Sequence, residues 1–562
     1  MSLLKNISIA VSLLCAMAPA VASGANVDVK GIAPYVYPEN IAKSPKSFTY
    51  MPDGESYLLL SDDGRQIGRY ETATGKLLET VLDVTHTREN SISQVADFRL
   101  SPDGTKLALY TEKQPVYRHS FLADWYVFEI KRNILRPLSK QFTRQQAPLF
   151  SPDGRMVAFV AENNIYVRKL DYQTEIAVTE DGSRNSIING VPDWTYEEEF
   201  QTTCSMTWAP DNLTLCYLRY DESDVPVYDM QRYGGACQTD PAAELYPVTW
   251  SYKYPVAGKT NSTVSLHSYD VETRKIKEIE LPDARIEYIP RIQYGPDAQS
   301  LIVATLNRDQ NHYEIYRVNP KSTVAKSIYN EDSKSWIDPA SYESLWLGKD
   351  CFVVNSWKSG YNRLYFYTYA GAPIREIGED SHDITAYYGS DALGNHYYQA
   401  ACPTPLDRTI RRIDRKGITT VVSASEGTSA GKFSPGCKYM MLSHSTTETV
   451  PQYSFCTSAG KSLRTLVDNA TFAAKAMPLH AAREFFTMPA DGGLQLNGYI
   501  IKPAGFSPSH KYPVIMYQYS GPGSQEVLNR WTLDWQDAFA KAGYIIVCVD
   551  GRGTGGRGRD FC

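Results

Sequence analysis

The sequence predicts a β-propeller followed by a smaller α/β domain, and two observations support this fold class. A short phrase recurs along most of the 562 residues, and the strand pattern changes after about residue 475. The clearest copies read YMPDGESYLLL, LSPDGTKLALY and FSPDGRMVAFV, and their prolines, Pro52, Pro102 and Pro152, lie 50 residues apart. Each copy combines an apolar residue, a Pro-Asp-Gly turn and an apolar strand. A unit of about 40–50 residues with short strands is typical of a propeller blade.

The repeat predicts a propeller over residues 46–474. Weaker copies continue the series as WAPDNLTLCYL, YGPDAQSLIVA and FSPGCKYMML. An array of β-sandwiches is the alternative, but it would not need one turn phrase at the same point of every unit. Because the later copies are less regular, we expect insertions between the turns at Pro210 and Pro296. The candidate insertion reads YGGACQTDPAAELYPVTWSYKYP.

Residues 475–562 predict the beginning of a parallel βαβ unit. EFFTMPADGGLQLNGYIIKPA indicates two strands around a turn, and YPVIMYQYS and YIIVCVDGRG indicate buried strands. Between the latter two, VLNRWTLDWQDAFAKAG has apolar residues at helical spacing from Val527 to Phe539 and ends at Gly543. Apolar strands joined by a helix are typical of a parallel sheet.

The composition describes a globular protein that is not built for nucleic acid. Hydrophobic residues make up 43% and charged residues 21%, and the net charge of −6 disfavours nucleic-acid or anionic-membrane partners. Lys5, an apolar run from Ile7 to about Ala18 and an Ala-Val-Ala site predict a signal peptide over residues 1–22, followed by an N-terminal segment over 23–45. The run is short for a membrane anchor. We therefore expect an exported, soluble protein that is periplasmic or secreted.

The cysteines and two glycine motifs predict no metal or cofactor site. No cysteine pair has metal-ligand spacing, and Cys204 with Cys216 is a candidate disulfide across neighbouring strands. GTSAG around Ser429 matches G-x-S-x-G, but a blade strand follows where a nucleophile elbow needs a helix. GRGTGG at 551–556 matches a dinucleotide motif, but two arginines interrupt any apolar helix start, so we expect a loop.

The segment PDWTYEEEF, Pro192–Phe200, places three carboxylates among aromatic side chains. Three other segments accompany it: YRHSF, DESDVPVYDM with YKYPVAGKTNSTV downstream, and YQYSGPGSQ followed by VDGRGTG. In the chain YRHSF comes first, PDWTYEEEF second and the other two segments after it. In this order the four segments resemble the dipeptidyl peptidase IV family of serine exopeptidases, and its bacterial members above all. The resemblance covers nearly all of the chain after the signal. It implies an eight-bladed propeller joined to an α/β-hydrolase domain.

The resemblance assigns roles to four residues. Glu198 and Glu199 match the glutamates that bind the substrate's α-amino group, which leaves Glu197 a structural role. An α-amine has a pKa near 7.7–8.0 and is largely cationic at neutral pH, so adjacent carboxylates can accept its hydrogen bonds. Arg118 matches the arginine that binds the carbonyl of the second substrate residue. Tyr519 matches the tyrosine that completes the oxyanion hole.

The resemblance also implies a class of substrate and the absence of the catalytic triad from these residues. The family releases N-terminal dipeptides with proline, or less readily alanine, in second position, so peptides with a free N-terminus are the expected partners. The family's Ser, Asp and His lie beyond the loop that here reads VDGRGTG. These 562 residues are therefore expected to be a fragment without the triad and to be inactive by themselves. Family members often dimerise, so a homodimer of the full-length protein is expected.

Two alternatives stay open. A non-catalytic propeller protein would bind peptide N-termini through the same carboxylates without turnover. A prolyl tripeptidyl peptidase-like enzyme is the other, although two adjacent glutamates disfavour it, because a longer amino-terminal segment needs an amine site placed elsewhere. An endopeptidase such as prolyl oligopeptidase is disfavoured for a similar reason.

Overall fold

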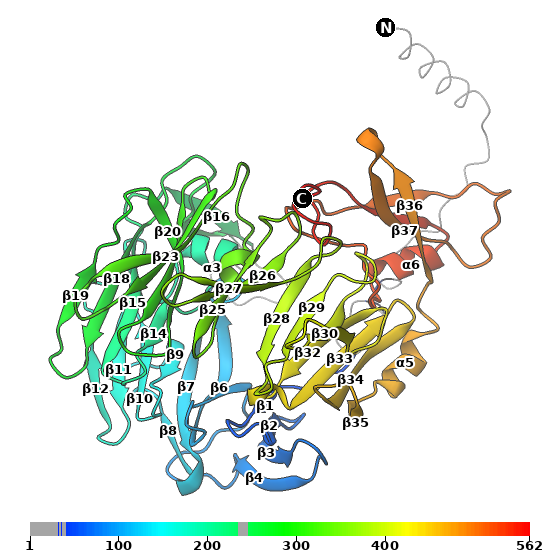
Figure 1. Ribbon diagram of the computed structural model, residues 1–562. Coiled ribbons are helices and arrows are strands. Elements are labelled where there is room, and N and C mark those ends of the chain that lie inside the picture. The colour runs from blue at the N-terminus through cyan, green and yellow to red at the C-terminus, as the bar shows by residue number, and fades with distance from the viewer. Residues whose placement is uncertain (1–31, 33–34, 36–40, 234–245) are drawn as a thin grey trace. The chain divides into compact units, whose positions relative to one another are not determined.

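A computed structural model describes residues 32, 35, 41–233 and 246–562, and most of its elements are strands (Figure 1). Seven four-stranded sheets and one five-stranded sheet, each built from neighbouring strands of the chain, follow one another from β1 to β35 in the described residues. These eight sheets are the blades, and they confirm the predicted eight-bladed propeller.

The bounds of the blade strands follow the repeats. Blades one to three contain β1 (Thr49–Tyr50), β2 (Ser56–Leu60), β3 (Gln66–Glu71), β4 (Leu77–Asp83), β5 (Asp97–Leu100), β6 (Lys106–Pro115), β7 (Phe121–Glu129), β8 (Ile134–Pro137), β9 (Gln146–Phe150), β10 (Met156–Ala161), β11 (Asn164–Lys169) and β12 (Thr174–Ala177). Blades four and five contain β13 (Ile187–Asn189), β14 (Met206–Trp208), β15 (Thr214–Asp221), β18 (Thr263–Asp270), β19 (Ile276–Ile279), β20 (Ile286–Tyr294), β21 (Leu301–Asn307), β22 (His312–Val318) and β23 (Ala325–Asp332). Blades six to eight contain β24 (Trp346–Leu347), β25 (Cys351–Ser356), β26 (Arg363–Thr368), β27 (Pro373–Ile377), β28 (Ile384–Ser390), β29 (His396–Ala400), β30 (Thr409–Ile413), β31 (Thr419–Val421), β32 (Thr428–Phe433), β33 (Tyr439–Thr446), β34 (Thr449–Thr457) and β35 (Ser462–Val467). The short helices are η2 (Ile130–Arg132), α3 (Trp194–Phe200), α4 (Ala340–Glu343), η4 (Pro435–Cys437) and α5 (Ala470–Ala476).

The chain divides into two compact units. The larger unit contains Pro45–Tyr398 and Phe433–Met440, and the smaller unit contains the described residues up to Ser44, Gln399–Lys432 and Met441–Cys562. Arg118, Glu198 and Glu199 belong to the larger unit, and Tyr519 belongs to the smaller one. Within the part of the chain that the structure describes, no helix is long and apolar enough to cross a membrane.

The Pro-Asp-Gly turns connect the first and second strands of the first three blades in the same way. The amides of Gly54, Gly104 and Gly154 each donate a 2.9 Å hydrogen bond to the carbonyl three residues earlier. Their φ angles are +67°, +72° and +66°, a region that glycine adopts without a Cβ penalty. A Cβ would lie 3.2 Å from Pro52 at Gly104 and 2.6 Å from Asp103 at Gly154. Glycine is therefore needed both for the turn and for the close approach of the preceding blade's turn.

The turn of the first blade contacts the turn of the last repeat. A Cβ on Gly54 would lie 2.7 Å from the carbonyl oxygen of Pro435. The Lys438 ammonium pairs with the Glu55 carboxylate at 2.7 Å, and the Tyr439 hydroxyl donates to Glu55 at 3.3 Å. All of these residues belong to the larger unit. The turns at the beginning and at the end of the repeat series are thus in contact.

The predicted insertion, residues 233–255, contains the second strand of a two-stranded ribbon. β16 (Val227–Arg232) and β17 (Val248–Lys253) pair antiparallel with each other, whereas β15 pairs directly with β18. The ribbon therefore interrupts the fourth blade in sequence without entering its sheet. Residues 234–245 of the predicted insertion lie outside the described residues.

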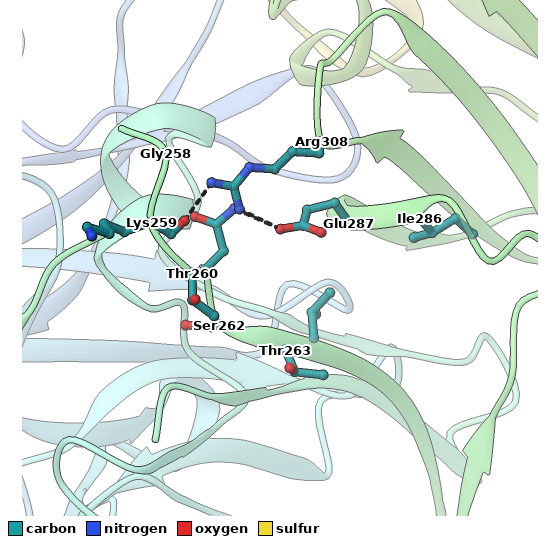
Figure 2. A pocket seen from close by; sticks show the side chains of 10 residues that line it. Gly258, Lys259, Thr260, Ser262, Thr263, Ile286, Glu287 and Arg308 are labelled. Atoms are coloured by element: carbon teal, nitrogen blue, oxygen red, sulfur yellow. Dashed lines mark hydrogen bonds and ion pairs between the residues drawn. The ribbon is translucent and has the colours of Figure 1, made fainter. Parts of the chain in front are cut away.

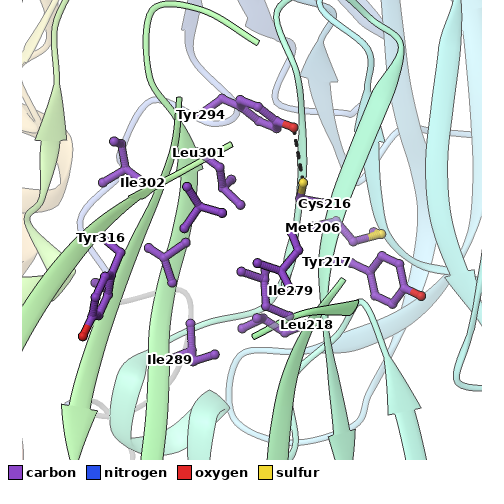
Figure 3. Close-up of a cluster of buried hydrophobic side chains, with 14 of the residues drawn as sticks. Met206, Cys216, Tyr217, Leu218, Ile279, Ile289, Tyr294, Leu301, Ile302 and Tyr316 are labelled. Carbon is purple, nitrogen blue, oxygen red and sulfur yellow. Dashed lines mark hydrogen bonds between the residues drawn. The ribbon is translucent and has the colours of Figure 1, made fainter. Parts of the chain in front are cut away.

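The largest hydrophobic core includes residues of blades three to six, and Figure 3 shows a part of it. The buried Cys216 in β15 lies with its Sγ 3.2 Å from the Tyr294 hydroxyl, and burial raises the pKa of this thiol to about 12. The predicted Cys204–Cys216 disulfide is wrong, because both thiols are free. Cys216 lies opposite Thr207 in the strand pair, and the Sγ of Cys204 instead faces the carbonyl of Met206 at 3.9 Å.

The sheet that follows the blades contains the predicted βαβ unit. Its strands and helix are β36 (Arg483–Pro489), β37 (Gln495–Ile501), β38 (Val514–Tyr517), α6 (Trp535–Lys541) and β39 (Ile545–Asp550), with η5 (Asp491–Gly493) at the first turn. The strand order is β36-β37-β39-β38. β38 and β39 are parallel, as predicted, while β37 joins β39 antiparallel.

The helix α6 is shorter than predicted. The sequence pattern places the beginning near Val527, but the helix begins at Trp535. The Asp534 side chain accepts from the Gln536 amide at 2.8 Å, and the Asp537 carboxylate accepts from the Asp534 amide at 3.0 Å. This capping box stops the helix from extending backwards. Val527 is still fully buried, in the segment without regular secondary structure before the helix.

Neither of the two glycine motifs, GTSAG and GRGTGG, forms the local structure that its chemistry would need. Ser429 is buried in β32, where its hydroxyl lies 2.9 Å from Nδ1 of His444. A strand residue in a blade cannot form a nucleophile elbow. Residues 551–556 form a loop after β39, and no helix opens from it in the described chain. The predicted loop is confirmed.

Candidate functional site

The acidic triplet lies on α3, a helix of seven residues in the loop between β13 and β14. Asp193 caps this helix, because its carboxylate accepts from the Tyr196 amide at 2.9 Å and from the Ser262 hydroxyl at 2.5 Å. Gln201, at a φ of 51°, ends it. This helix is not among the predicted elements, although an Asp before an aromatic-rich run is an ordinary N-cap signal.

The loop that supplies Ser262 is itself fixed in place. Figure 2 shows Arg308 between the Lys259 carbonyl, at 2.6 Å, and the Glu287 carboxylate, at 2.8 Å. Asn261 adds a 2.7 Å hydrogen bond to the Tyr288 hydroxyl. Apart from Tyr288, these residues border a cavity of about 620 Å³ that none of the predicted site residues lines. The segment YKYPVAGKTNSTV therefore serves to orient the beginning of α3.

The aromatic residues around the triplet anchor the helix. The Tyr196 hydroxyl accepts from the Ile289 amide at 2.9 Å. The Phe200 ring packs edge-on against Tyr288 and Tyr342, with ring centroids 5.4 and 5.5 Å apart. Residues four apart share a helix face, so Tyr196 and Phe200 bury one side of α3. The three glutamates between them therefore lie on the other sides of the helix.

The three glutamates point in three directions. Consecutive helical residues are turned by about 100° relative to one another, and the environments differ accordingly. Glu197 is 1% exposed and accepts from the backbone amides of His119, at 2.6 Å, and Ser120, at 3.1 Å. It also accepts from the Ser120 hydroxyl. Glu197 is thus fully engaged inside the protein, whereas Glu199 is exposed.

Glu198 forms a forked ion pair with Arg118. Nε and Nη2 of Arg118 lie 3.0 and 2.8 Å from the two carboxylate oxygens of Glu198. The structure therefore brings together residues 80 positions apart, from the β6–β7 loop and from α3. The Arg118 side chain is 70% exposed and the Glu198 side chain 25%. The guanidinium, which has five N–H donors, uses only two of them in this pair.

The electrostatics of this group favour one positive charge. Desolvation and then the charge of Glu198 raise the pKa of Glu199 above its usual value. With one arginine and two glutamates, the formal charge of Arg118, Glu198 and Glu199 together is −1. A small cation placed against Glu199 would neutralise the group, and the remaining guanidinium donors could bind a carbonyl beside it.

A buried acid that sequence analysis did not single out lies nearby. Glu222, directly after β15, is 6% exposed and lines a cavity of about 850 Å³ together with Tyr117, Ser120 and Trp250. Burial and then the charge of Asp193 raise the pKa of Glu222 to about 7. Its only sequence signal is an acid at the end of an apolar strand, in the segment DESDVPVYDM.

One group of side chains in the larger unit has the composition of a metal site. Ligand atoms of Asp283, His312 and Glu314 lie within 4.8 Å of one another. The Arg285 guanidinium, however, pairs with Asp283 at 2.7 Å and lies 3.3 Å from Nε2 of His312. This arginine already supplies the positive charge between the acids, so the group offers no argument for a metal ion.

Tyr519 lies in the smaller unit, in the loop after β38, and is 59% exposed. Its carbonyl accepts from the Ser524 hydroxyl at 3.1 Å, and its ring packs against Gly521. An exposed phenol in a short loop is accessible to a reacting group. Its role as an oxyanion donor stays a prediction.

The fold and the site residues define a class of protein. It is an eight-bladed propeller that presents two carboxylates from α3 and an arginine from the β6–β7 loop. Within this class, the model of the dipeptidyl peptidase IV N-terminal region matches residues 101–451. The chain belongs to this family.

Known proteins of similar sequence and structure agree with the assignment. The chain is 28% identical to a probable dipeptidyl-aminopeptidase B of Aspergillus oryzae, with 90% of this chain and 59% of the relative covered. It is 30% identical to dipeptidyl-aminopeptidase B of Aspergillus niger, with 82% and 54% covered. The chain thus spans less than two thirds of these relatives. The crystal structure of Porphyromonas gingivalis dipeptidyl peptidase 4 is similar at 40% identity and a TM-score of 0.89, over 95% of this chain and 75% of that one. A putative dipeptidyl aminopeptidase IV of Bacteroides ovatus shares the fold, at 19% identity and a TM-score of 0.74 over 96% and 76%.

Proposed function

We propose that this chain recognises the free N-terminus of peptides as part of a dipeptidyl peptidase IV-type serine exopeptidase that releases Xaa-Pro or Xaa-Ala dipeptides. The observation that carries the proposal is the placement of Glu198 and Glu199 on α3 with Arg118 forked onto Glu198. The protonated α-amine would bind between the two carboxylates, and the carbonyl of the second residue would accept from Arg118.

Such a site distinguishes the free N-terminus of a peptide from positions inside a chain. A chain that continues past this point brings a neutral amide instead of an ammonium group. The carboxylates would then lose solvent without gaining a charged partner, which costs free energy. The same reasoning favours a peptidase that removes short N-terminal segments over one that cleaves inside a chain.

The proposal includes the reaction and the location that the family implies. The Tyr519 hydroxyl would donate to the oxyanion of a tetrahedral intermediate, where one such donor is worth about 10²–10³ in rate. Export to the periplasm or medium rests on residues 1–22, which lie outside the described residues. A homodimer of the full-length protein also belongs to the proposal.

Binding of a matched pair of peptides tests the recognition. We expect calorimetry to show at least tenfold tighter binding of Gly-Pro-Ala with a free amine than of its N-acetylated form, because acetylation removes the charge. Equal affinities would contradict the proposal. Turnover of a Gly-Pro chromogenic amide by the full-length protein, which would include the Ser, Asp and His that these 562 residues are expected to lack, then separates the two classes. Release of the chromophore supports the peptidase, and binding without release supports the non-catalytic propeller protein.

The affinity should depend on pH with a maximum near neutrality. Binding needs Glu199 ionised, and its raised pKa means that affinity falls, as pH is lowered, sooner than for a glutamate with a pKa near 4.5. On the alkaline side, affinity should fall as the peptide amine deprotonates, near pH 7.7–8.0. Calorimetry between pH 4 and 9 checks both limbs.

A peptide with an N-terminal trimethylammonium group is the control for the alkaline limb, because its charge does not titrate. It has no N–H donors, so it should bind more weakly than the free amine near neutrality, and its affinity should not fall between pH 7 and pH 9. Glu199→Gln is the control for the acid limb. If this variant kept the same acid limb as the wild-type protein, Glu199 would not be the titrating group.

A further inference from the structure

We propose that Glu197 is a positioning residue that fixes the β6–β7 loop to α3 and thereby sets Arg118 against Glu198 and Glu199. This inference rests on the function proposed above, since it concerns the geometry of the same site. Glu197 itself faces the protein interior, so it acts through Arg118 and not on the peptide.

The contacts of Glu197 converge on the residues that directly follow Arg118. One carboxylate oxygen accepts from the amides of His119 and Ser120, at 2.6 and 3.1 Å, and the other accepts from the Ser120 hydroxyl. Consecutive backbone amides that converge on one anion form a nest. The loop is also closed on itself by the bond from the Val116 amide to the Ser120 carbonyl at 2.9 Å. The backbone on the C-terminal side of Arg118 is therefore tied to α3.

The Arg118–Glu198 pair cannot hold this geometry alone. Arg118 is mostly exposed, and an exposed ion pair contributes little because water screens it and a long side chain loses rotamer freedom in it. The bonds of Glu197 are buried and charge-assisted, which makes them about twice as strong as neutral ones. Of the two links between α3 and the loop, the buried one should decide where Arg118 lies.

A purely structural role predicts something different. If Glu197 only stabilised the fold, its loss would lower stability and weaken peptide binding regardless of what residue 118 is. A positioning role makes the effect of Glu197 depend on Arg118. A double-mutant cycle separates these cases, because it measures the coupling between two residues.

The test compares Glu197→Gln, Arg118→Ala and the double variant of the full 562-residue chain, with the Kd of Gly-Pro-Ala as the readout. We expect Glu197→Gln to weaken binding about tenfold in the wild-type background and to cause no further loss in the Arg118→Ala background. Equal losses in both backgrounds, or no loss in either, would overturn the proposal. If Glu197→Gln does not fold, Ser120→Ala replaces it, with a smaller loss and the same dependence on Arg118.

Glu331→Gln is the matched control. Glu331, in β23, accepts from the hydroxyls of Ser356 and Tyr329, so its replacement also removes a hydrogen-bonded carboxylate from a blade. It should leave the affinity for the peptide unchanged.

Hydrogen exchange without peptide provides a second readout, which distinguishes failure of this inference from failure of the proposed function. The amides of His119 and Ser120 should exchange at least tenfold faster in Glu197→Gln than in the wild-type protein. If the wild-type chain does not prefer a peptide with a free N-terminus, the proposed function fails. The exchange result still decides whether Glu197 holds the β6–β7 loop. Unchanged protection of both amides would overturn the role of Glu197.

Discussion

Replacing both Glu198 and Glu199 by glutamine should raise the Kd for a free-amine peptide on the order of 10²- to 10⁴-fold. Each charge-assisted hydrogen bond to the ammonium group is worth roughly 1.5–3 kcal/mol, and each 1.4 kcal/mol is about tenfold in affinity. Glutamine keeps the size of the side chain but offers no negative charge. Calorimetry with Gly-Pro-Ala and its acetylated form measures the effect, and the two affinities should become similar.

The single variants should differ from each other. Glu198→Gln also removes the charged partner of Arg118, so it should weaken contacts to the substrate carbonyl as well as to the amine. Glu199→Gln should affect the amine alone. A Glu272→Gln/Glu278→Gln variant, which removes two exposed charges from the larger unit, is the control for net charge. A double Glu198/Glu199 variant that still prefers the free amine would refute the assignment.

Replacing Glu222 by glutamine should stabilise the larger unit at alkaline pH and leave its stability nearly unchanged at acid pH. Burial raises the pKa of Glu222 from 4.5 to about 7. A raised carboxyl pKa means that the folded state favours the protonated form. The contribution of Glu222 to stability is therefore fully present below about pH 4.5 and is lost as pH rises to about 7.

The expected size of this effect follows from the shift. At 1.36 kcal/mol for each pKa unit, ionised Glu222 costs about 3 kcal/mol at pH 8. The Asn185 backbone donates a hydrogen bond to the Glu222 carboxyl group, and glutamine can still accept it while avoiding this cost. Urea unfolding followed by tryptophan fluorescence at pH 5 and pH 8 would compare the variants, with Glu272→Gln as an exposed control. A stability gain that is the same at both pH values would show that Glu222 is not the titrating group.

The blades could be predicted from the sequence because their signals are local. The Pro-Asp-Gly phrase specifies a turn with glycine at a positive φ, and the apolar run after it specifies a strand, so copies such as those at Gly54 and Gly104 needed no knowledge of their neighbours. The length of α6 was not predictable in this way. Apolar spacing suggested a helix from Val527, but the capping box at Asp534 began the helix later.

The sequence by itself determined which residue types the site would contain: two adjacent glutamates after an aromatic pair, an arginine in YRHSF and a tyrosine in YQYSGPG. Only the tertiary structure decided how the glutamates and the arginine, which lie in the larger unit, are arranged around one another. Successive glutamates on a helix point about 100° apart, so which acid faces inward depends on the surface against which α3 packs. That surface comes from residues about 80 positions away, whose approach depends on the stacking of whole blades. For this reason Glu197 and Glu222, identical in type to the predicted site residues, acquire their roles only from burial and distant partners.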